Sequence, residues 1–241
     1  MNHHTVESLI EAESRVVQLF NEGQLPYLLH LSGGNEAKLI EIFQMIKPED
    51  WVLSTHRAHY HFLLKGGTPD ELVKNIKAGR SMFLYSAALN FLSSSIVAGL
   101  VSTAVGLGMA STLQGYRTEE ARCPRVWCFL GDGGEDEGHF YEAVRYANGH
   151  NLPVTFIIEN NNRSVETSIR KRWGDHDIPI DWPNNVIRYN YTPTYPHAGT
   201  GGKMVQFTPQ SIEEAREAWS SYYARPHDWT KLIEEAIEEG H

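Results

Sequence analysis

Two short runs of apolar residues, 126–130 and 154–158, give the clearest structural signal in the chain. Between them, apolar residues recur at the helical spacing of three and four, namely Phe140, Ala143, Val144 and Ala147. Strand, helix and strand in this order predict a βαβ unit with parallel strands. Polar residues follow each run directly, at 131–134 and at 159–162. We therefore expect both polar clusters at the carboxyl edge of the sheet, where open α/β sheets bind ligands.

The rest of the hydrophobic pattern predicts further helices and strands. Helices are expected at 5–22, 36–46, 68–78, 95–115, 211–224 and 228–239, and strands at 51–54 and 186–191. Asn35 is a plausible N-cap, and Thr68 with Pro69 is typical of a helix start. Irregular structure is expected at 81–94, 163–184 and 192–203. We predict one α/β domain, residues 1–241, with a parallel sheet and helices on both faces.

Composition and charge narrow the possible classes of function. The chain has 241 residues, of which 41% are hydrophobic and 21% charged, as in ordinary globular proteins. The net charge of −9 argues against nucleic-acid binding, which needs clustered Lys and Arg. Residues 96–113 carry Ser, Thr and several Gly, so a buried helix is expected there and not a membrane span. Two cysteines form no disulfide framework, and the N-terminus lacks a signal-peptide pattern. We therefore expect a cytoplasmic protein.

The polar residues after the two central strands suggest a cation site. Glycine amides beside Asp132 could approach a phosphate, but the aspartate would repel it unless a cation lay between them. Mg²⁺ prefers oxygen ligands, and the side chain of Asn161 offers one. A di- or triphosphate bridged by Mg²⁺ is therefore the chemistry that we expect. The alternative is an ordinary turn and an ordinary loop. The two motifs, about 26 residues apart within an intact βαβ pattern, favour the site.

These motifs are similar to those of a known enzyme family. Residues 131–143 and 151–161, GDGGEDEGHFYEA and NLPVTFIIENN, resemble the thiamine diphosphate motif. In particular, they resemble the alpha subunit of the decarboxylating first component of 2-oxoacid dehydrogenase complexes. The same family is matched in order by residues 30–37, 51–67 and 95–110, and more weakly by 194–200. The resemblance implies a thiamine diphosphate-binding fold and the cofactors thiamine diphosphate and Mg²⁺.

The resemblance also implies residues for the metal and the diphosphate. Asp132 and Asn161 would bind Mg²⁺ through their side chains, and Arg163 would bind it through its backbone carbonyl. Gly133 and Gly134 would donate backbone amides to the diphosphate.

Further cofactor-binding positions are implied in the same way. Arg57 would contact the diphosphate, a task that suits its planar cation. Ser95 and Val97 would meet the aminopyrimidine ring through backbone groups, although the family usually has glycine in place of Ser95. His56 stands where the family usually has tyrosine, and Ser164 follows the metal-binding segment.

Three histidines are expected to act catalytically. The resemblance places His30 and His59 near the substrate and the reacting carbon of the cofactor. His197 falls where a loop histidine of the family stabilises charge near the cofactor. Each has an alternative as a structural residue, and His30, which lies between two leucines, could belong to the core.

The chain departs from the family in three respects. It is about a third shorter, and roughly one βα unit is missing between Asn161 and His197. The residues 135–137, Glu-Asp-Glu, place unusual acidity near the diphosphate. The glutamate that activates the cofactor comes from the beta subunit in this family, so a beta-type partner is expected.

The resemblance leads to a specific expectation of function. We predict an alpha-type subunit of a thiamine diphosphate-dependent oxidoreductase. It would decarboxylate a 2-oxoacid and transfer the acyl or aldehyde unit to an acceptor such as the lipoamide of a carrier protein. One alternative is a transketolase-like ketol transferase, and another is a non-catalytic partner subunit. No nucleic acid or membrane is expected as a partner.

Overall fold

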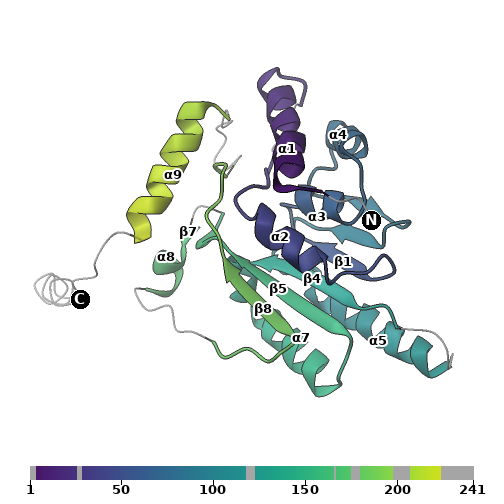
Figure 1. The fold of residues 1–241 in the computed structure, drawn as a ribbon. Coiled ribbons are helices and arrows are strands. Elements are labelled where there is room, and N and C mark those ends of the chain that lie inside the picture. Colours follow the sequence, from purple (N-terminus) through teal and green to yellow (C-terminus); the bar gives the residue numbers. More distant parts are fainter. Residues whose placement is uncertain are drawn as a thin grey trace, which may run out of the picture.

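A computed structural model gives the fold of the chain (Figure 1), and it describes residues 4–25, 29–117, 123–165, 167–174, 180–197 and 207–223. The sheet in its centre has the strand order β2-β3-β1-β4-β5-β8. Its strands are β1 (Trp51–Ser54), β2 (Tyr85–Ser86), β3 (Phe91–Ser93), β4 (Val126–Gly131), β5 (Val154–Asn160) and β8 (Val186–Asn190). All neighbouring strands are parallel except β2, which pairs antiparallel with β3. The described residues therefore form the predicted α/β sheet.

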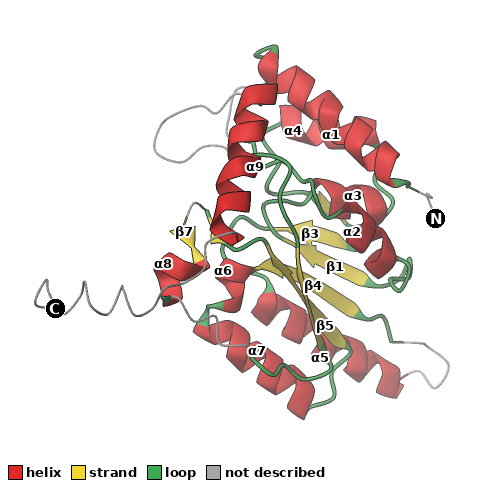
Figure 2. Cartoon of the chain, turned by 60° about the vertical axis from the view of Figure 1, so that its left-hand side comes forward, coloured by secondary structure: helices red, strands yellow, loops and turns green. Residues whose placement is uncertain are grey.

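Helices cover both faces of the sheet (Figure 2). The first face carries α1 (Val6–Asn21), α2 (Glu36–Phe43), α3 (His59–Leu64) and α4 (Pro69–Lys77). The second carries α5 (Val101–Arg117) and α7 (Gly138–Gly149). A further helix, α9 (Pro209–Tyr223), follows the segment with Phe207, which packs on Phe20 of α1 at 5.2 Å between ring centroids.

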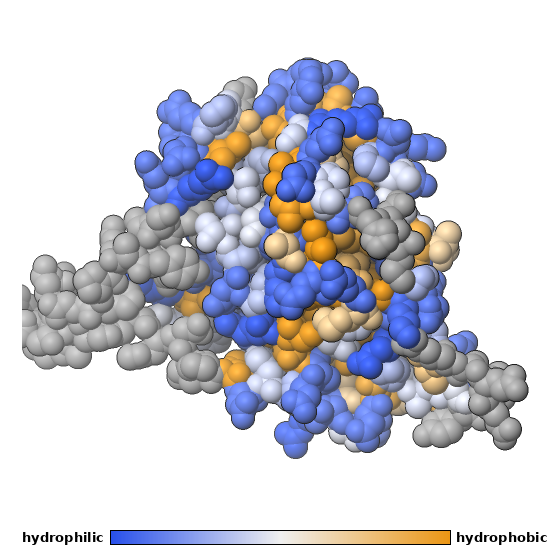
Figure 3. All heavy atoms as spheres, viewed as in Figure 1, coloured by the Kyte–Doolittle hydropathy of each residue, from blue (hydrophilic) through white to orange (hydrophobic). Residues whose placement is uncertain are grey.

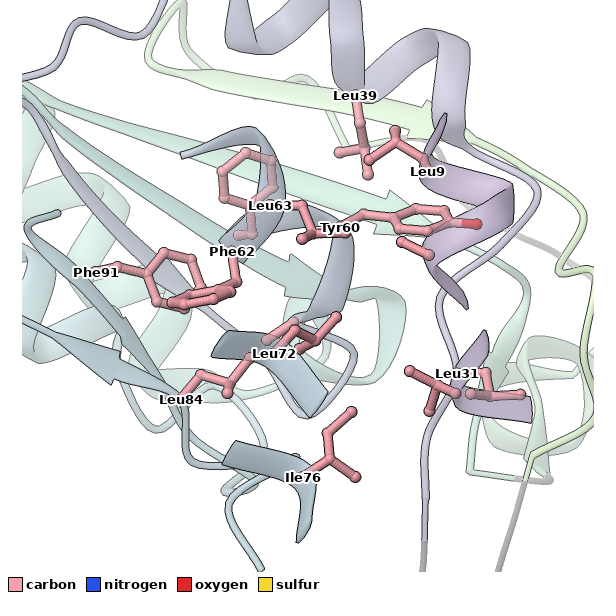
Figure 4. Packing of buried hydrophobic residues seen from close by; sticks show 14 of the residues in the cluster. Leu9, Leu31, Leu39, Tyr60, Phe62, Leu63, Leu72, Ile76, Leu84 and Phe91 are labelled. Atoms are coloured by element: carbon pink, nitrogen blue, oxygen red, sulfur yellow. The ribbon is translucent and has the colours of Figure 1, made fainter. Parts of the chain in front are cut away.

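The alternation of side chains along β4 and β5 produces two separate cores. Trp127, Phe129 and Ile157 belong to the core under α1 to α4, whereas Cys128 and Phe156 belong to the core under α5 and α7. Successive residues of a strand point to opposite faces, so a strand buried on both sides is apolar throughout. Figure 4 shows the first core, where Tyr60, Phe62 and Phe91 pack with leucines of α1, α2, α3 and α4.

Several predicted elements are confirmed with small shifts at their ends. The strand at 51–54 and the βαβ unit of β4, α7 and β5 occur as expected. Helix α4 begins with a complete capping box between Thr68 and Glu71, with Pro69 in its first turn.

In the space-filling view (Figure 3), apolar side chains run through the middle of one face between polar ones.

Other predictions were wrong, for local reasons. Residues 95–100 are not helical, and α5 begins only at Val101. Residues 81–94, expected to be irregular, contain β2 and the internal strand β3, which is too short to show periodicity. Asn35 stands at the N-cap of α2, but its side chain makes no capping bond. It donates to Glu159 Oε1 at 3.0 Å and to Tyr189 Oη at 3.1 Å.

The segment after β5 is also more ordered than its sequence suggests. A small hairpin of β6 (Arg163–Ser164) and β7 (Thr167–Ser168) leads into the short helix α8 (Ile169–Trp173). The next strand, β8, pairs directly with β5. That a βα unit of the family is missing here stays a prediction. The helix expected at 228–239 and the loop from 198 to 203 lie outside the described residues.

None of the helices in the described ranges is long and apolar enough to cross a membrane. That residues 1–241 form a single domain stays a prediction.

Candidate functional site

The carboxyl edge of the sheet brings the two polar clusters together, as predicted. Gly131 at the end of β4 pairs with Glu159 near the end of β5. The GDGG sequence is more than a turn, because Asp132 begins the four-residue helix α6 (Asp132–Glu135), with Gly131 as its N-cap. A pocket opens at this edge. It is lined by Thr55, His56, Arg57, Ile96, Val97, Ala98, Gly131, Asp132, Gly133, Gly134, Glu159, Asn161, Arg163, Ser164, Val165, Tyr191 and His197.

Asp132 lines this pocket and is only 1% exposed. Its Oδ2 accepts a hydrogen bond from Arg172 Nη2 at 2.7 Å. Its Oδ1 is buried and has no hydrogen-bond partner within the described ranges. A buried carboxylate oxygen without a partner is costly, so this atom is well suited to a cation.

The segment that follows β5 also lines the pocket. Asn161 is 9% exposed; its amide donates to Tyr191 Oη at 3.2 Å, and its Oδ1 accepts from the backbone of Arg163 at 3.0 Å. An amide oxygen has a second lone pair and can still bind a cation. Asn162 adopts a φ of 62°, which turns the chain sharply between Asn161 and Arg163. The side chain of Asn161 and the backbone of Arg163 are therefore held close to the pocket.

Glycine at position 133 is needed for close packing. A side chain there would collide with the hydroxyl and Cβ of Ser164 in β6. The backbone of α6 can therefore lie directly against β6, which contacts it. Both segments line the pocket, and their backbone groups remain close to it.

The unusual acidity after Asp132 is balanced by arginines. Glu135 accepts two bonds of 3.0 Å from Arg188 Nε and one of 2.9 Å from Trp182 Nε1. Asp136 forms an ion pair of 2.8 Å with Arg172. Burial raises the pKa of Asp136, and Arg172 opposes that shift. Both arginines come from the chain after β5, so this segment supplies the counter-charges of the acids that follow β4.

Three histidines, His30, His56 and His197, lie close together beside Arg57. His30 lies 4.8 Å from His56 and 4.5 Å from His197 between ring centroids. Arg57 Nη2 lies 3.0 Å from His197 Nδ1, and Arg57 Nη1 donates to the carbonyl of Leu31 at 2.7 Å. Because a guanidinium only donates, His197 Nδ1 must be unprotonated there. The ring nitrogens are close enough for a metal, yet the adjacent guanidinium charge disfavours one.

Burial and the guanidinium charge determine the protonation of these rings. Burial, followed by the charge of Arg57, lowers the pKa of His30 to about 3. The same two causes lower the pKa of His56 well below its ordinary value. Both rings are therefore neutral near pH 7 and can act as hydrogen-bond donors or acceptors, but not as imidazolium acids.

His59 lies elsewhere, although it was expected near the substrate. It is fully buried and does not line the pocket. Its Nδ1 is 3.0 Å from both carboxylate oxygens of Glu13, and its Nε2 is 2.9 Å from Ser81 Oγ. A second buried ring, His61, lies in a similar way between Ser54 and Glu159. These contacts tie helices α1 and α3 to the sheet, whereas the catalytic role expected for His59 stays a prediction.

Ten of the residues selected from the sequence line the pocket, and three, His30, His59 and Ser95, do not. His56, Arg57, Val97, Asp132, Gly133, Gly134, Asn161, Arg163, Ser164 and His197 lie in its lining. His30 contacts the rings of His56 and His197, and Ser95 precedes the lining residues 96–98.

Other residues of the lining were not predicted from the sequence. Glu159 and Tyr191 could have been found, because each lies at the carboxyl end of a predicted strand. Ala98 and Val165 have φ values of 50° and 57°, conformations that are strained for residues with a Cβ and that often mark functional sites. Nothing in the sequence pattern indicated Arg172.

Comparisons with known proteins place this geometry in context. The profile of the dehydrogenase E1 component family matches residues 5–174. The alpha subunit of acetoin:2,6-dichlorophenolindophenol oxidoreductase from Bacillus subtilis (strain 168) is 33% identical over 214 residues, which are 85% of this chain and 60% of the relative. The alpha subunit of the pyruvate dehydrogenase E1 component from Porphyra purpurea is 29% identical over 164 residues, 64% of this chain and 48% of the relative.

The chain thus spans only about half to three fifths of the length of these curated relatives. Among solved structures, transketolase from Campylobacter jejuni subsp. jejuni aligns with a TM-score of 0.47 and 18% identity, covering 72% of this chain and 31% of that one.

Proposed function

The chain belongs to the dehydrogenase E1 component family, and we propose that it is an alpha-type subunit that binds thiamine diphosphate through Mg²⁺. The reaction would be the decarboxylation of a 2-oxoacid, followed by transfer of the acyl or aldehyde unit to an acceptor. Because the chain spans only part of its relatives, this activity, its substrate and its partners are proposals.

The observation that carries the proposal is the buried Oδ1 of Asp132, which has no hydrogen-bond partner among the described residues. Asn161, Gly133 and Gly134 line the same pocket as Asp132, at the carboxyl edge of the sheet. The donors are oxygen atoms, as Mg²⁺ requires. The residues present therefore fit both the ion and a diphosphate.

Each group of the pocket then receives a role. Asp132, Asn161 and the carbonyl of Arg163 would hold the ion, while Arg57 and the amides of Gly133 and Gly134 would bind the diphosphate. The bound cofactor supplies the electron sink that decarboxylation needs. Ser164 and the segment with Ser95 and Val97 would complete the walls around it.

The histidines would serve the substrate through neutral hydrogen bonds. With a pKa of about 3, His30 cannot donate a proton as an imidazolium near pH 7. His30, His56 and His197 can instead orient a carboxylate or carbonyl oxygen by N–H donation beside the charge of Arg57. Water would be excluded from this end by the packing of the three rings.

A second chain would complete the site. Glu159 is an acid of the lining, and it already accepts bonds from Tyr189 at 2.6 Å and from Asn35 at 3.0 Å. We propose that a beta-type subunit supplies the activating glutamate. A lipoyl carrier protein is the acceptor that the resemblance suggests.

The test is the binding of the cofactor to the chain with its partner subunit. Calorimetry should give Mg²⁺-dependent binding of thiamine diphosphate to the wild type, and Asp132→Ala should abolish it. Glu142→Ala, which removes an exposed acid of α7, is the matched control and should bind normally. Unchanged binding by Asp132→Ala would overturn the metal site, and turnover of ketose phosphates instead of 2-oxoacids would overturn the reaction.

A further inference from the structure

Arg172 makes an unexpected connection across the proposed cation site. It comes from α8, in the part of the chain where the sequence shows no periodicity. Its Nη2 donates to Asp132 Oδ2 at 2.7 Å, its Nε pairs with Asp136 at 2.8 Å, and its Nη1 donates to the carbonyl of Thr167 at 3.2 Å. The side chain of Arg172 is only 15% exposed.

These contacts distinguish the two oxygens of Asp132. Arg172 holds Oδ2, and Oδ1 is left without a partner within the described residues. The planar guanidinium is hydrogen-bonded through Nη1 and Nη2 and lies in an ion pair with Asp136, so it cannot follow a rotating carboxylate and holds Asp132 in one orientation. Groups that hydrogen-bond to a metal ligand without contacting the metal commonly determine the affinity of the site for that metal.

The charges are compatible with a cation at Oδ1. Asp136 lies 2.8 Å from Arg172, so one guanidinium is shared between two carboxylates. The guanidinium therefore does not offset Asp132 alone, and the three side chains together can still attract a cation. Without Asp136, the guanidinium would neutralise Asp132 and weaken its attraction for a cation.

The backbone around Arg172 joins the two sides of the site. Arg163 and Ser164 of β6 line the pocket and pair with Ser168 and Thr167 of β7. Helix α8 follows directly, with Ser168 as its N-cap. The bond from Arg172 to Thr167 fastens this segment, and the bond to Asp132 ties it to α6. One side chain thus links the segment after Asn161 to the aspartate at the end of β4.

We propose that Arg172 is a positioning residue of the divalent cation site. It holds Oδ2 of Asp132 so that Oδ1 faces the ion, and it keeps the segment around Arg163 in a fixed position relative to Asp132. Arg172 itself contacts neither the ion nor the cofactor. This inference rests on the proposed function, because it assigns a role toward the ion that the proposed function places at Asp132.

The experiment measures metal affinity directly, without turnover. Free Mn²⁺, a paramagnetic substitute for Mg²⁺, is titrated by electron paramagnetic resonance into the full chain with its partner subunit and thiamine diphosphate. Arg172→Gln should raise the Kd for Mn²⁺ about tenfold or more, the usual effect of removing a group that orients a metal ligand. Arg172→Lys, which keeps the charge but only one point of contact, should recover part of the affinity.

Arg188→Gln is the matched control, because Arg188 pairs with Glu135 in the same acidic turn at 3.0 Å. Its Kd for Mn²⁺ should stay within about twofold of the wild type. A purely structural role would lower the melting temperature of Arg172→Gln without changing the Kd, and it would overturn the inference. A tighter Kd would also overturn it, by showing that Arg172 competes with the ion.

Failure of the proposed function looks different. In that case the wild type itself binds no Mn²⁺ in the presence of the cofactor, and the inference falls with it. If the wild type binds and Asp132→Ala does not, the effect of Arg172→Gln decides the inference alone.

Discussion

At the scale of the residue, the site depends on side chains whose charge is set by their surroundings. Asp132 is buried, one of its oxygens is paired with Arg172, and the other has no partner among the described residues. His30 is buried beside a guanidinium and is therefore neutral. The site thus combines a carboxyl group, neutral imidazoles and a guanidinium. This arrangement suits a cation and an anion bound next to each other.

The pKa of His30 predicts how stability depends on pH. Burial, with Arg57, His197 and His59 nearby and His56 in ring contact, lowers it to about 3. Between that value and about 6.5 the unfolded chain binds a proton that the folded chain does not, so stability is lost as pH falls. This one group should cost about 2 kcal/mol of unfolding free energy between pH 7 and pH 5.

Urea unfolding at both pH values measures this loss. His30→Gln should reduce the difference between them, while His150→Gln, at an exposed position of the chain, should leave it unchanged. An imidazole signal of His30 that titrates near pH 6.5 in NMR spectra would contradict the prediction.

At the scale of the element, buried polar links hold the helices of the first face to the sheet. Glu13 of α1 is fully buried and meets His59 of α3, which in turn contacts Ser81. Glu13 also accepts the backbone amide of Ser32, in the segment that leads to α2. The histidine at position 30 and the N-terminal helices are therefore positioned through one carboxylate.

Removal of this carboxylate should destabilise the fold. Glu13→Ala leaves a buried imidazole and a buried amide without a partner, which should cost roughly 3 kcal/mol of unfolding free energy. Chemical denaturation measures the change. Glu11→Ala, on the exposed side of the same helix, is the control and should change stability by less than about 0.5 kcal/mol. Equal stabilities of the two variants would show that the link contributes nothing.

At the scale of the whole molecule, the site lies open at the edge of the sheet. Ile96 is 71% exposed and Val97 is 47% exposed, and both line the pocket. Large apolar side chains at the rim of a site are typical of a surface that another chain covers. This agrees with a proposed partner that completes the site.

The exposed rim leads to a prediction about assembly. Ile96→Asp should weaken association with the beta-type subunit about tenfold or more, because a charge would be buried at the contact. Sedimentation of mixtures of the two chains measures the change. Ile10→Asp places the same charge on α1, where Ile10 is 44% exposed and does not line the pocket, and should associate normally. Equal association of both variants would place the partner elsewhere.

The sequence by itself determined the centre of the fold and the two polar clusters at its carboxyl edge. Long buried strands and an amphipathic helix carry their own periodicity, so β4, α7 and β5 were predictable, as were the capping residues of α4. Parallel pairing then requires that residues 29 positions apart, Asp132 and Asn161, lie at one edge. Local chemistry and simple topology were sufficient for these features.

Only the tertiary structure decided which distant side chains meet. Packing between segments far apart in the chain brings Arg172 to Asp132 and places His30, His56 and His197 together. It also buries His59 in the core, where this ring contacts Glu13. Short elements such as β3 and α8 lack the length to show a period, so neighbouring strands and ion pairs determine their structure. Those contacts depend on three-dimensional packing, and the local pattern of apolar and polar residues does not predict them.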